Sequence, residues 1–168
     1  PDVVYTLLGS CISACIRDPL TLIGGMNHFM LPVPRREAGD GDVWQDSARY
    51  GSFAMEVLIN EILEYGGSRD RLEVKLFGGG KIYESSTNIG AANAQWVFEF
   101  LETEKIDVVS HDLGEEWPRK VFYCTDSGRA LVKRVQKLDD EEVKRQERIY
   151  TEQLNKEAEE EECDVTLF

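Results

Sequence analysis

The sequence has little basic charge, no long apolar run and few histidines. Its 168 residues carry 19 basic and 32 acidic side chains, a formal net charge of −13. A protein that binds the phosphate backbone of nucleic acids needs a basic face, so this balance argues against nucleic-acid binding. No apolar run approaches the ~20 residues of a membrane span, and no basic-then-apolar leader stands at the start. We therefore expect neither membrane insertion nor secretion.

Paired metal-ligand spacings are missing as well. The cysteines at positions 11, 15, 124 and 163 form no Cys-x-x-Cys motif, and neither His28 nor His111 has a thiol or carboxylate at a known ligand spacing. Asp112 beside His111 is the single suggestion of a ligand pair. We expect no metal or other cofactor. The cysteines indicate reduced thiols in a cytoplasmic protein, one of them available as a nucleophile.

Three glycines followed by a lysine at 78–81 invite a nucleotide-binding interpretation, which the neighbouring residues exclude. The phosphate-binding loop requires glycine where Lys75 stands and serine or threonine where Ile82 stands. The dinucleotide fingerprint requires its third glycine where Tyr83 stands. We interpret the run as a flexible loop at the end of a strand.

Strand-like patterns dominate residues 1–138, which we expect to form one domain. The predicted strands cover 3–8, 12–17, 22–31, 72–77, 106–110, 120–124 and 130–135. Helical periodicity covers 50–65 and 88–104, and the Pro- and Gly-containing stretch 32–47 predicts a mobile surface loop. Strands with two inserted helices indicate the α+β class, with a β-rich, sandwich-like core, a mixed or antiparallel sheet and two packed helices.

Acidic charge is concentrated in residues 139–168, which we expect to form a separate, helical C-terminal extension. This stretch holds 12 acidic and 4 basic side chains, a net charge of −8. Four acids at 139–142 suit a helix N-terminus, where the helix dipole favours negative charge. Val143, Tyr150 and Leu154 would form only a thin apolar stripe. We therefore expect residues 139–162 to be largely solvated, dispensable for catalysis and available for contact with a partner.

The residues that could carry chemistry lie in the first predicted hairpin. An Asp-Pro step favours a turn after Asp18, and a two-residue turn would pair Asp18 with Thr21 and place Cys11 opposite His28. Directly opposed side chains have Cβ atoms about 4.5–5.5 Å apart, so this thiol and imidazole could share a proton, as a cysteine nucleophile requires. A register slipped by one residue would separate them, leaving Cys11 and Cys15 as merely buried small side chains.

An ordered series of short motifs surrounds this pair. The motifs stand at 6–11 (TLLGSC), 18–19 (DP), 24–32 (GGMNHFMLP), 48–51 (ARYG), 77–79 (FGG), 88–93 (NIGAAN), 112–114 (DLG), 118–119 (PR) and 125–129 (TDSGR). Together they resemble CheD, the chemoreceptor glutamine deamidase family of bacterial chemotaxis. The resemblance covers residues 1 to about 138 and leaves out the acidic extension.

This resemblance implies an α/β sandwich related to the catalytic domain of cytotoxic necrotizing factor toxins. It also implies hydrolysis of particular glutamine side chains on the cytoplasmic helices of methyl-accepting chemotaxis proteins, without a cofactor. The phosphatase CheC, which binds the family in some bacteria, is the other implied partner. The family's nucleophile corresponds to Cys11, its histidine to His28 and its catalytic threonine to Thr6, with Tyr5 as the alternative occupant of that position.

The chemistry that these residues imply is a thioester mechanism. His28 would take the proton of Cys11, the thiolate would attack the glutamine carbonyl, and backbone N–H groups near residues 9–11 would stabilise the oxyanion. Thr6 would fix the imidazole tautomer. Two alternatives stay open: an adaptor that binds a receptor or CheC without catalysis, and an esterase that acts on receptor methyl esters. The presence of both Cys11 and His28 favours an enzyme over an adaptor.

Overall fold

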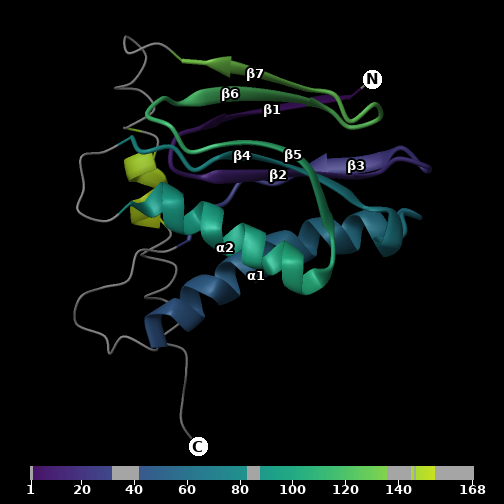
Figure 1. Ribbon diagram of the computed structural model, residues 1–168, viewed down its shortest axis with the longest axis horizontal. Coiled ribbons are helices and arrows are strands. Elements are labelled where there is room, and N and C mark those ends of the chain that lie inside the picture. The colour runs from purple at the N-terminus through teal and green to yellow at the C-terminus, as the bar shows by residue number, and fades with distance from the viewer. Residues whose placement is uncertain (1, 32–41, 83–87, 136–144, 146, 154–168) are drawn as a thin grey trace, which may run out of the picture.

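Two β-sheets and two long helices form three layers in the computed structural model (Figure 1). The structure describes residues 2–31, 42–82, 88–135, 145 and 147–153. In the view of Figure 1 the three-stranded sheet lies at the top, the four-stranded sheet in the middle and the helices below. The middle sheet is therefore covered on both faces.

The secondary structure agrees with the predicted α+β class. The strands are β1 (Val3–Leu8), β2 (Ile12–Asp18), β3 (Ile23–Met26), β4 (Glu73–Gly78), β5 (Asp107–Leu113), β6 (Arg119–Cys124) and β7 (Ala130–Arg134). The helices are α1 (Asp42–Glu64), the short 3-10 helix η1 (Arg69–Arg71) and α2 (Ile89–Glu104), and residues 147–153 are also helical.

The two sheets have the strand orders β1-β6-β7 and β3-β2-β4-β5. All neighbours pair antiparallel except β4 and β5, which run parallel. The four-stranded sheet is therefore mixed, one of the two predicted possibilities. The parallel pair is joined through α2, as a crossover between parallel strands requires.

Helix α1 begins eight residues before the predicted helix, at Asp42 instead of residue 50. The predicted surface loop is therefore wrong from Asp42 onward, and its first part, 32–41, lies outside the described residues. The prolines and glycines that indicated a loop all precede Asp42 in the sequence. Gly51, well inside the helix, lies where a Cβ would come within 2.6 Å of the Trp96 ring, so the helix and its neighbour approach closely there.

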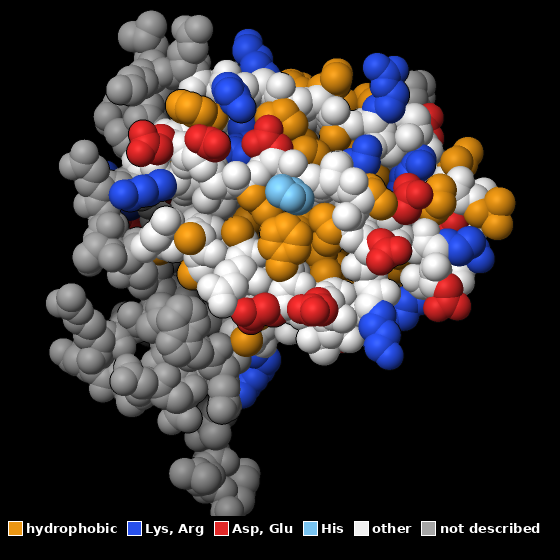
Figure 2. Space-filling view, viewed as in Figure 1, with side chains coloured by type: hydrophobic (Ala, Val, Ile, Leu, Met, Phe, Trp, Pro, Cys, Tyr) orange, Lys and Arg blue, Asp and Glu red, His pale blue; other side chains and the backbone are white. Residues whose placement is uncertain are grey.

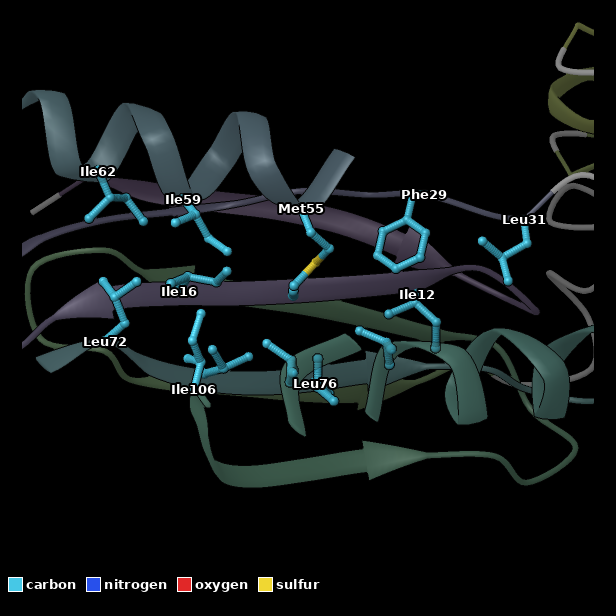
Figure 3. Packing of buried hydrophobic residues seen from close by; sticks show 14 residues of the cluster. Ile12, Ile16, Phe29, Leu31, Met55, Ile59, Ile62, Leu72, Leu76 and Ile106 are labelled. Atoms are coloured by element: carbon cyan, nitrogen blue, oxygen red, sulfur yellow. The ribbon is translucent and has the colours of Figure 1, made fainter. Parts of the chain in front are cut away.

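The apolar core has two parts, one on each face of the four-stranded sheet. On one side, Ile12 and Ile16 of β2 pack against Met55 and Ile59 of α1 (Figure 3). On the other side, a second cluster fills the space toward the three-stranded sheet. Its buried members are Leu8, Cys11, Cys15, Met30, Phe77, Val121 and Tyr123.

The face of the molecule shown in Figure 2 carries side chains of both charges. On the face shown in Figure 2, acidic and basic side chains are interspersed around a central group of apolar side chains. Basic charge does not gather on that face. Within the described ranges, no helix is long and apolar enough to cross a membrane.

Candidate active site

The loop between β2 and β3 is two residues longer than predicted. Asp18 pairs with Ile23 instead of Thr21, so four residues separate the two strands. The Asp18 carboxylate accepts hydrogen bonds from the backbone N–H groups of Leu20 and Thr21, at 2.8 and 3.3 Å. Leu22 takes a left-handed conformation with φ 60°. The side chain of Asp18 thus closes a longer loop than the Asp-Pro step indicated, and the predicted register is wrong by two residues.

This two-residue shift keeps Cys11 and His28 on the same side of the sheet. A bridge between Ile12 and Phe29, with N···O distances of 2.8 and 2.9 Å, continues the β2–β3 register. His28 is therefore level with Ser13, two positions along from Cys11. Because side chains alternate along a strand, Cys11 and His28 are diagonal neighbours. The predicted direct opposition is wrong, whereas the predicted shared face is confirmed.

Asn27 interrupts the second strand just before His28. Its side-chain Oδ1, instead of its carbonyl, accepts the hydrogen bond from the Ala14 N–H at 2.9 Å. Its carbonyl accepts the Ser13 hydroxyl at 2.6 Å, and its Nδ2 donates to the Ala54 carbonyl of α1 at 3.1 Å. The predicted strand 22–31 is thus broken at Asn27, which anchors the backbone that carries His28. Sequence reasoning missed this role, since an isolated asparagine in an apolar run carries no periodic signal.

Thr6 contacts His28 across the two sheets. The Oγ1 of Thr6, on β1, lies 2.8 Å from Nδ1 of His28. When Nδ1–H donates to this hydroxyl, Nε2 carries the lone pair that a general base requires. Tyr5 is 73% exposed and stacks on Phe122 with ring centroids 5.9 Å apart. The structure thus places Thr6 at the histidine and Tyr5 at the surface.

The glycine loop at 78–80 is hydrogen-bonded to the backbone around Cys11. The N–H of Gly79 donates to the Cys11 carbonyl and the N–H of Gly80 to the Gly9 carbonyl, both at 2.8 Å. Gly78 has φ 109°, and a Cβ there would collide with the Cys11 carbonyl. The loop lies at the end of β4 as predicted, but it is buried and hydrogen-bonded, so the predicted flexibility is wrong. The glycines allow two backbone segments to approach closely.

Asn93 of α2 fixes the same loop at its centre. Its Nδ2 donates to the Ser10 carbonyl at 2.9 Å, and its Oδ1 accepts the Leu31 N–H at 3.0 Å. The carbonyls of Gly9, Ser10 and Cys11 therefore all accept hydrogen bonds from the side of the glycine loop and α2. A carbonyl and the following N–H point in opposite directions across a planar peptide, so the N–H groups of Ser10 and Cys11 face outward. Backbone N–H groups arranged in this way can donate to an oxyanion.

The carboxylate of Glu147 lies against these outward N–H groups. Glu147 is 6% exposed, and its Oε1 accepts a short hydrogen bond from the Ser10 N–H and one from the Ser10 hydroxyl at 3.2 Å. Its buried Oε2 has no hydrogen-bond partner among the described residues. Burial raises the pKa of Glu147, while the backbone N–H groups of Gly9, Ser10 and Cys11 oppose that rise.

Tyr150, one helical turn after Glu147, also contacts the site. Its ring centroid lies 5.7 Å from that of His28, and its hydroxyl lies 3.3 Å from the hydroxyl of Tyr50. The segment is helical and most of its side chains are exposed, as expected, whereas buried Glu147 and half-buried Tyr150 contradict the prediction at their own positions. An acidic residue is buried here because a cluster of backbone N–H groups receives it, and no residue pattern encodes that cluster.

Burial shifts the pKa values of the Cys11 thiol and the His28 imidazole. Burial and the nearby Glu147 carboxylate raise the pKa of the Cys11 thiol, while loss of solvent around the imidazole lowers the pKa of His28, although the residue as a whole is exposed. Burial also raises the pKa of Cys15, to about 12. With Glu147 in place, the site therefore favours a neutral thiol and a neutral imidazole.

The only suggested metal ligands are engaged elsewhere. His111 lies on exposed β5 against the Phe98 ring, with centroids 5.6 Å apart, and Asp112 accepts a short hydrogen bond from buried Arg119. In the part of the chain that the structure describes, no group of three His, Cys, Asp or Glu side chains could hold a metal ion.

Comparison with known proteins identifies relatives along most of the chain. A family model described as "CheD chemotactic sensory transduction" matches residues 30–134. The chain is 46% identical over 165 residues to a protein of Hydrogenovibrio crunogenus named "Probable chemoreceptor glutamine deamidase CheD", and the match covers 98% of this chain and 85% of that protein. It is 48% identical over 155 residues to "Probable chemoreceptor glutamine deamidase CheD 1" of Dechloromonas aromatica, covering 91% and 75% of the two chains.

Proposed function

The chain belongs to the CheD family of chemoreceptor glutamine deamidases, which are amidohydrolases, and we propose that Cys11 and His28 carry out its reaction. The proposed substrates are glutamine side chains on the cytoplasmic helices of methyl-accepting chemotaxis receptors. One observation carries the proposal: Cys11 stands in a loop whose N–H groups face outward, on the same side of the sheet as an imidazole held by Thr6.

In the first half of the proposed reaction, Cys11 forms a bond to the substrate. Nε2 of His28 accepts the thiol proton, while Nδ1–H stays hydrogen-bonded to Thr6. The sulfur attacks the side-chain carbonyl carbon of glutamine, and the carbonyl electron pair moves to oxygen. The backbone N–H groups of the loop around Ser10 donate to this oxyanion.

In the second half, ammonia leaves and water enters. The imidazolium of His28 gives its proton to the amide nitrogen, the carbon–nitrogen bond breaks, and a thioester to Cys11 remains. His28 then accepts a proton from water, whose oxygen attacks the thioester carbon, and the carbon–sulfur bond breaks. The net change is one amide and one water converted to one carboxylic acid and one ammonia.

The pKa direction of His28 supports its role as the base. Loss of solvent lowers this pKa, so the imidazole is neutral at neutral pH and can accept a proton. Burial, and after it the nearby Glu147 carboxylate, raises the pKa of the thiol. Because Glu147 also accepts the hydrogen bonds of the Ser10 N–H and hydroxyl, the proposed reaction requires that substrate replace Glu147.

The test is mass spectrometry of a cytoplasmic receptor fragment incubated with the protein in ¹⁸O-labelled water. Deamidation converts particular glutamines to glutamates that carry one ¹⁸O, because the new oxygen comes from water. The same fragment incubated with the Cys11→Ala protein is the matched control and is expected to stay unchanged. Binding of the fragment without conversion would support an adaptor, and release of methanol from a methylated fragment would support an esterase; either result alone would contradict the proposal.

We also propose a cytoplasmic location and, as a further partner, a phosphatase of the CheC kind. Both follow from the family and from the location of the receptor helices. Co-purification of a CheC relative with the full chain would test the second.

A further inference from the structure

Glu147 has the chemical form of the reaction product. Deamidation of a glutamine leaves a glutamate side chain, one of whose oxygens has just occupied the oxyanion hole. Oε1 of Glu147 accepts hydrogen bonds from the N–H and hydroxyl of Ser10, where that oxygen is expected. Gly9 leaves the space for it, since a Cβ on Gly9 would lie 2.6 Å from the Glu147 carboxyl carbon.

We infer that the helical segment 147–153 is a built-in product mimic, which occupies the substrate site with Glu147 and must be displaced by a receptor helix before the enzyme acts. The inference rests on the proposed function, because it takes Cys11 as nucleophile and glutamine as substrate. It goes further by assigning a regulatory role to the C-terminal extension and a docking mode to the substrate.

One face of the segment makes the contacts. Glu147 is buried, and Tyr150 and Thr151, three and four residues later, are half-buried. Arg148, Ile149, Glu152 and Gln153 are exposed. Positions i, i+3 and i+4 lie on one side of a helix. The matching substrate is therefore a helix that presents glutamine at position i and packs its i+3 side chain against His28.

The docked segment opposes catalysis in two ways. It fills the space in front of Cys11 with a buried side chain, which excludes a glutamine from the same position. It also places a carboxylate beside the thiol, which disfavours the thiolate; burial of the thiol, and after it this carboxylate, raises the pKa of Cys11. Docking of Glu147 is less favourable because its buried Oε2 has no hydrogen-bond partner among the described residues. A competing helix with a neutral amide avoids the cost of burying a charged group.

The sharpest test is to make the mimic a substrate. In Glu147→Gln, the segment presents a glutamine to Cys11, and we expect the protein to convert this introduced glutamine back to glutamate in the absence of receptor. Water supplies the oxygen and ammonia leaves, as in the proposed reaction. Mass spectrometry of the peptide that contains position 147 follows the conversion. The double variant Glu147→Gln/Cys11→Ala is expected to retain its glutamine, and so is Glu152→Gln, whose side chain is exposed on the same helix.

A second test measures release of the site. In Glu147→Ala, we expect KM for a receptor fragment to fall several-fold with kcat nearly unchanged, and iodoacetamide to alkylate Cys11 faster. Glu152→Ala is the matched control, because it removes the same charge from the exposed side of the helix. Loss of activity in a folded Glu147→Ala protein would make Glu147 part of the catalytic machinery, and unchanged KM and alkylation would make it a packing residue. Both outcomes overturn the inference.

The two tests separate failure of the inference from failure of the proposed function. If the wild-type protein converts receptor glutamines while the introduced glutamine persists in Glu147→Gln, the product mimic is refuted and the proposed function stands. If neither the receptor glutamines nor the introduced glutamine are converted, the proposed function fails and the product mimic fails with it. Faster alkylation of Cys11 in Glu147→Ala would then show only that the segment covers the thiol.

Discussion

The two faces of the four-stranded sheet are built from alternate residues of the same strand, yet they serve different purposes. Toward the helices, β2 presents Ile12, Ala14 and Ile16, all fully buried in one apolar cluster. Toward the second sheet, Cys11 and Cys15 join a cluster that ends at the proposed active site. The helix-facing side is a continuous apolar layer. On the other side, the apolar cluster borders the Ser10 N–H, the His28 imidazole and the Glu147 carboxylate.

This difference separates what stabilises the fold from what positions the chemistry. The helix-facing layer depends on side-chain volume and burial, which are non-directional. The other face depends on hydrogen bonds with fixed geometry, made by Asn27, Asn93 and the glycine loop. Substitutions on the first face should therefore change stability, and those on the second should change activity.

The largest expected loss of activity comes from Cys11→Ala, on the side of the proposed active site. Removal of a nucleophile lowers kcat/KM by at least about 10³-fold, or roughly 4 kcal/mol in the transition state. The substitution is small, so the domain should stay folded, as measured by circular dichroism and thermal unfolding. Cys15→Ala is the matched control on the same strand face and should retain activity. Turnover by a Cys11→Ala protein would refute the proposed nucleophile.

Ile16→Ala should show the opposite pattern. Ile16 is fully buried on the helix-facing side, and truncation of such a side chain lowers the free energy of unfolding by about 2–5 kcal/mol. Urea denaturation measures this loss, and kcat per folded molecule at low temperature should equal that of the wild type. A stable Ile16→Ala protein with impaired turnover would show that the two faces cannot be separated.

Asn93→Ala should change both properties, because Asn93 lies on α2 and holds the loop around Ser10. Its removal leaves two buried backbone groups without their partner, at about 1–3 kcal/mol each. We expect reduced stability together with a roughly ten-fold lower kcat/KM, since about 1.4 kcal/mol of lost oxyanion stabilisation corresponds to a factor of ten. Gln95→Ala, on the same helix but away from this loop, is the control. An effect on stability alone would mean that Asn93 does not position the oxyanion hole.

Thr6→Val should give the smallest change. The hydroxyl contributes one hydrogen bond to His28, and a net contribution of about 0.5–1.5 kcal/mol corresponds to a two- to twelve-fold loss in kcat. Thr6→Ser keeps the hydroxyl and should restore most of the rate. Equal losses in the valine and serine variants would point to packing instead of the hydrogen bond.

The pH profile gives a readout that packing would not change. His28 acts as a neutral base in the proposed mechanism, so kcat/KM should fall as pH falls through the pKa of His28. Loss of solvent places that pKa below its usual 6.5. Thr6→Val removes a partner of Nδ1–H, which also stabilises the imidazolium, so the acid limb should move to still lower pH. An unmoved acid limb in Thr6→Val would contradict a hydrogen bond to the protonated ring.

Sequence patterns predicted the strands and the shared face of the proposed catalytic pair better than the contacts that hold them. Apolar alternation located each strand of the described residues, although the predicted strand 22–31 runs five residues past the end of β3, and the shared face of Cys11 and His28 followed from strand geometry. The exact register did not follow, because the Asp18 side chain closes a four-residue loop that the Asp-Pro step does not specify. Burial of Glu147 was not predictable either, since it depends on a partner 137 residues away in the sequence.

The four-residue loop closed by Asp18 limits how the length of this hairpin can change. If the loop keeps its four residues, an insertion or deletion of one residue must be absorbed by a one-residue shift of strand register, which would turn either Cys11 or His28 into the apolar layer beneath α1. A change of two residues would move the pair along the sheet and keep both on the side of the proposed site. Length changes that shift the register of this hairpin should therefore be tolerated in even numbers, unless a β-bulge absorbs the odd residue.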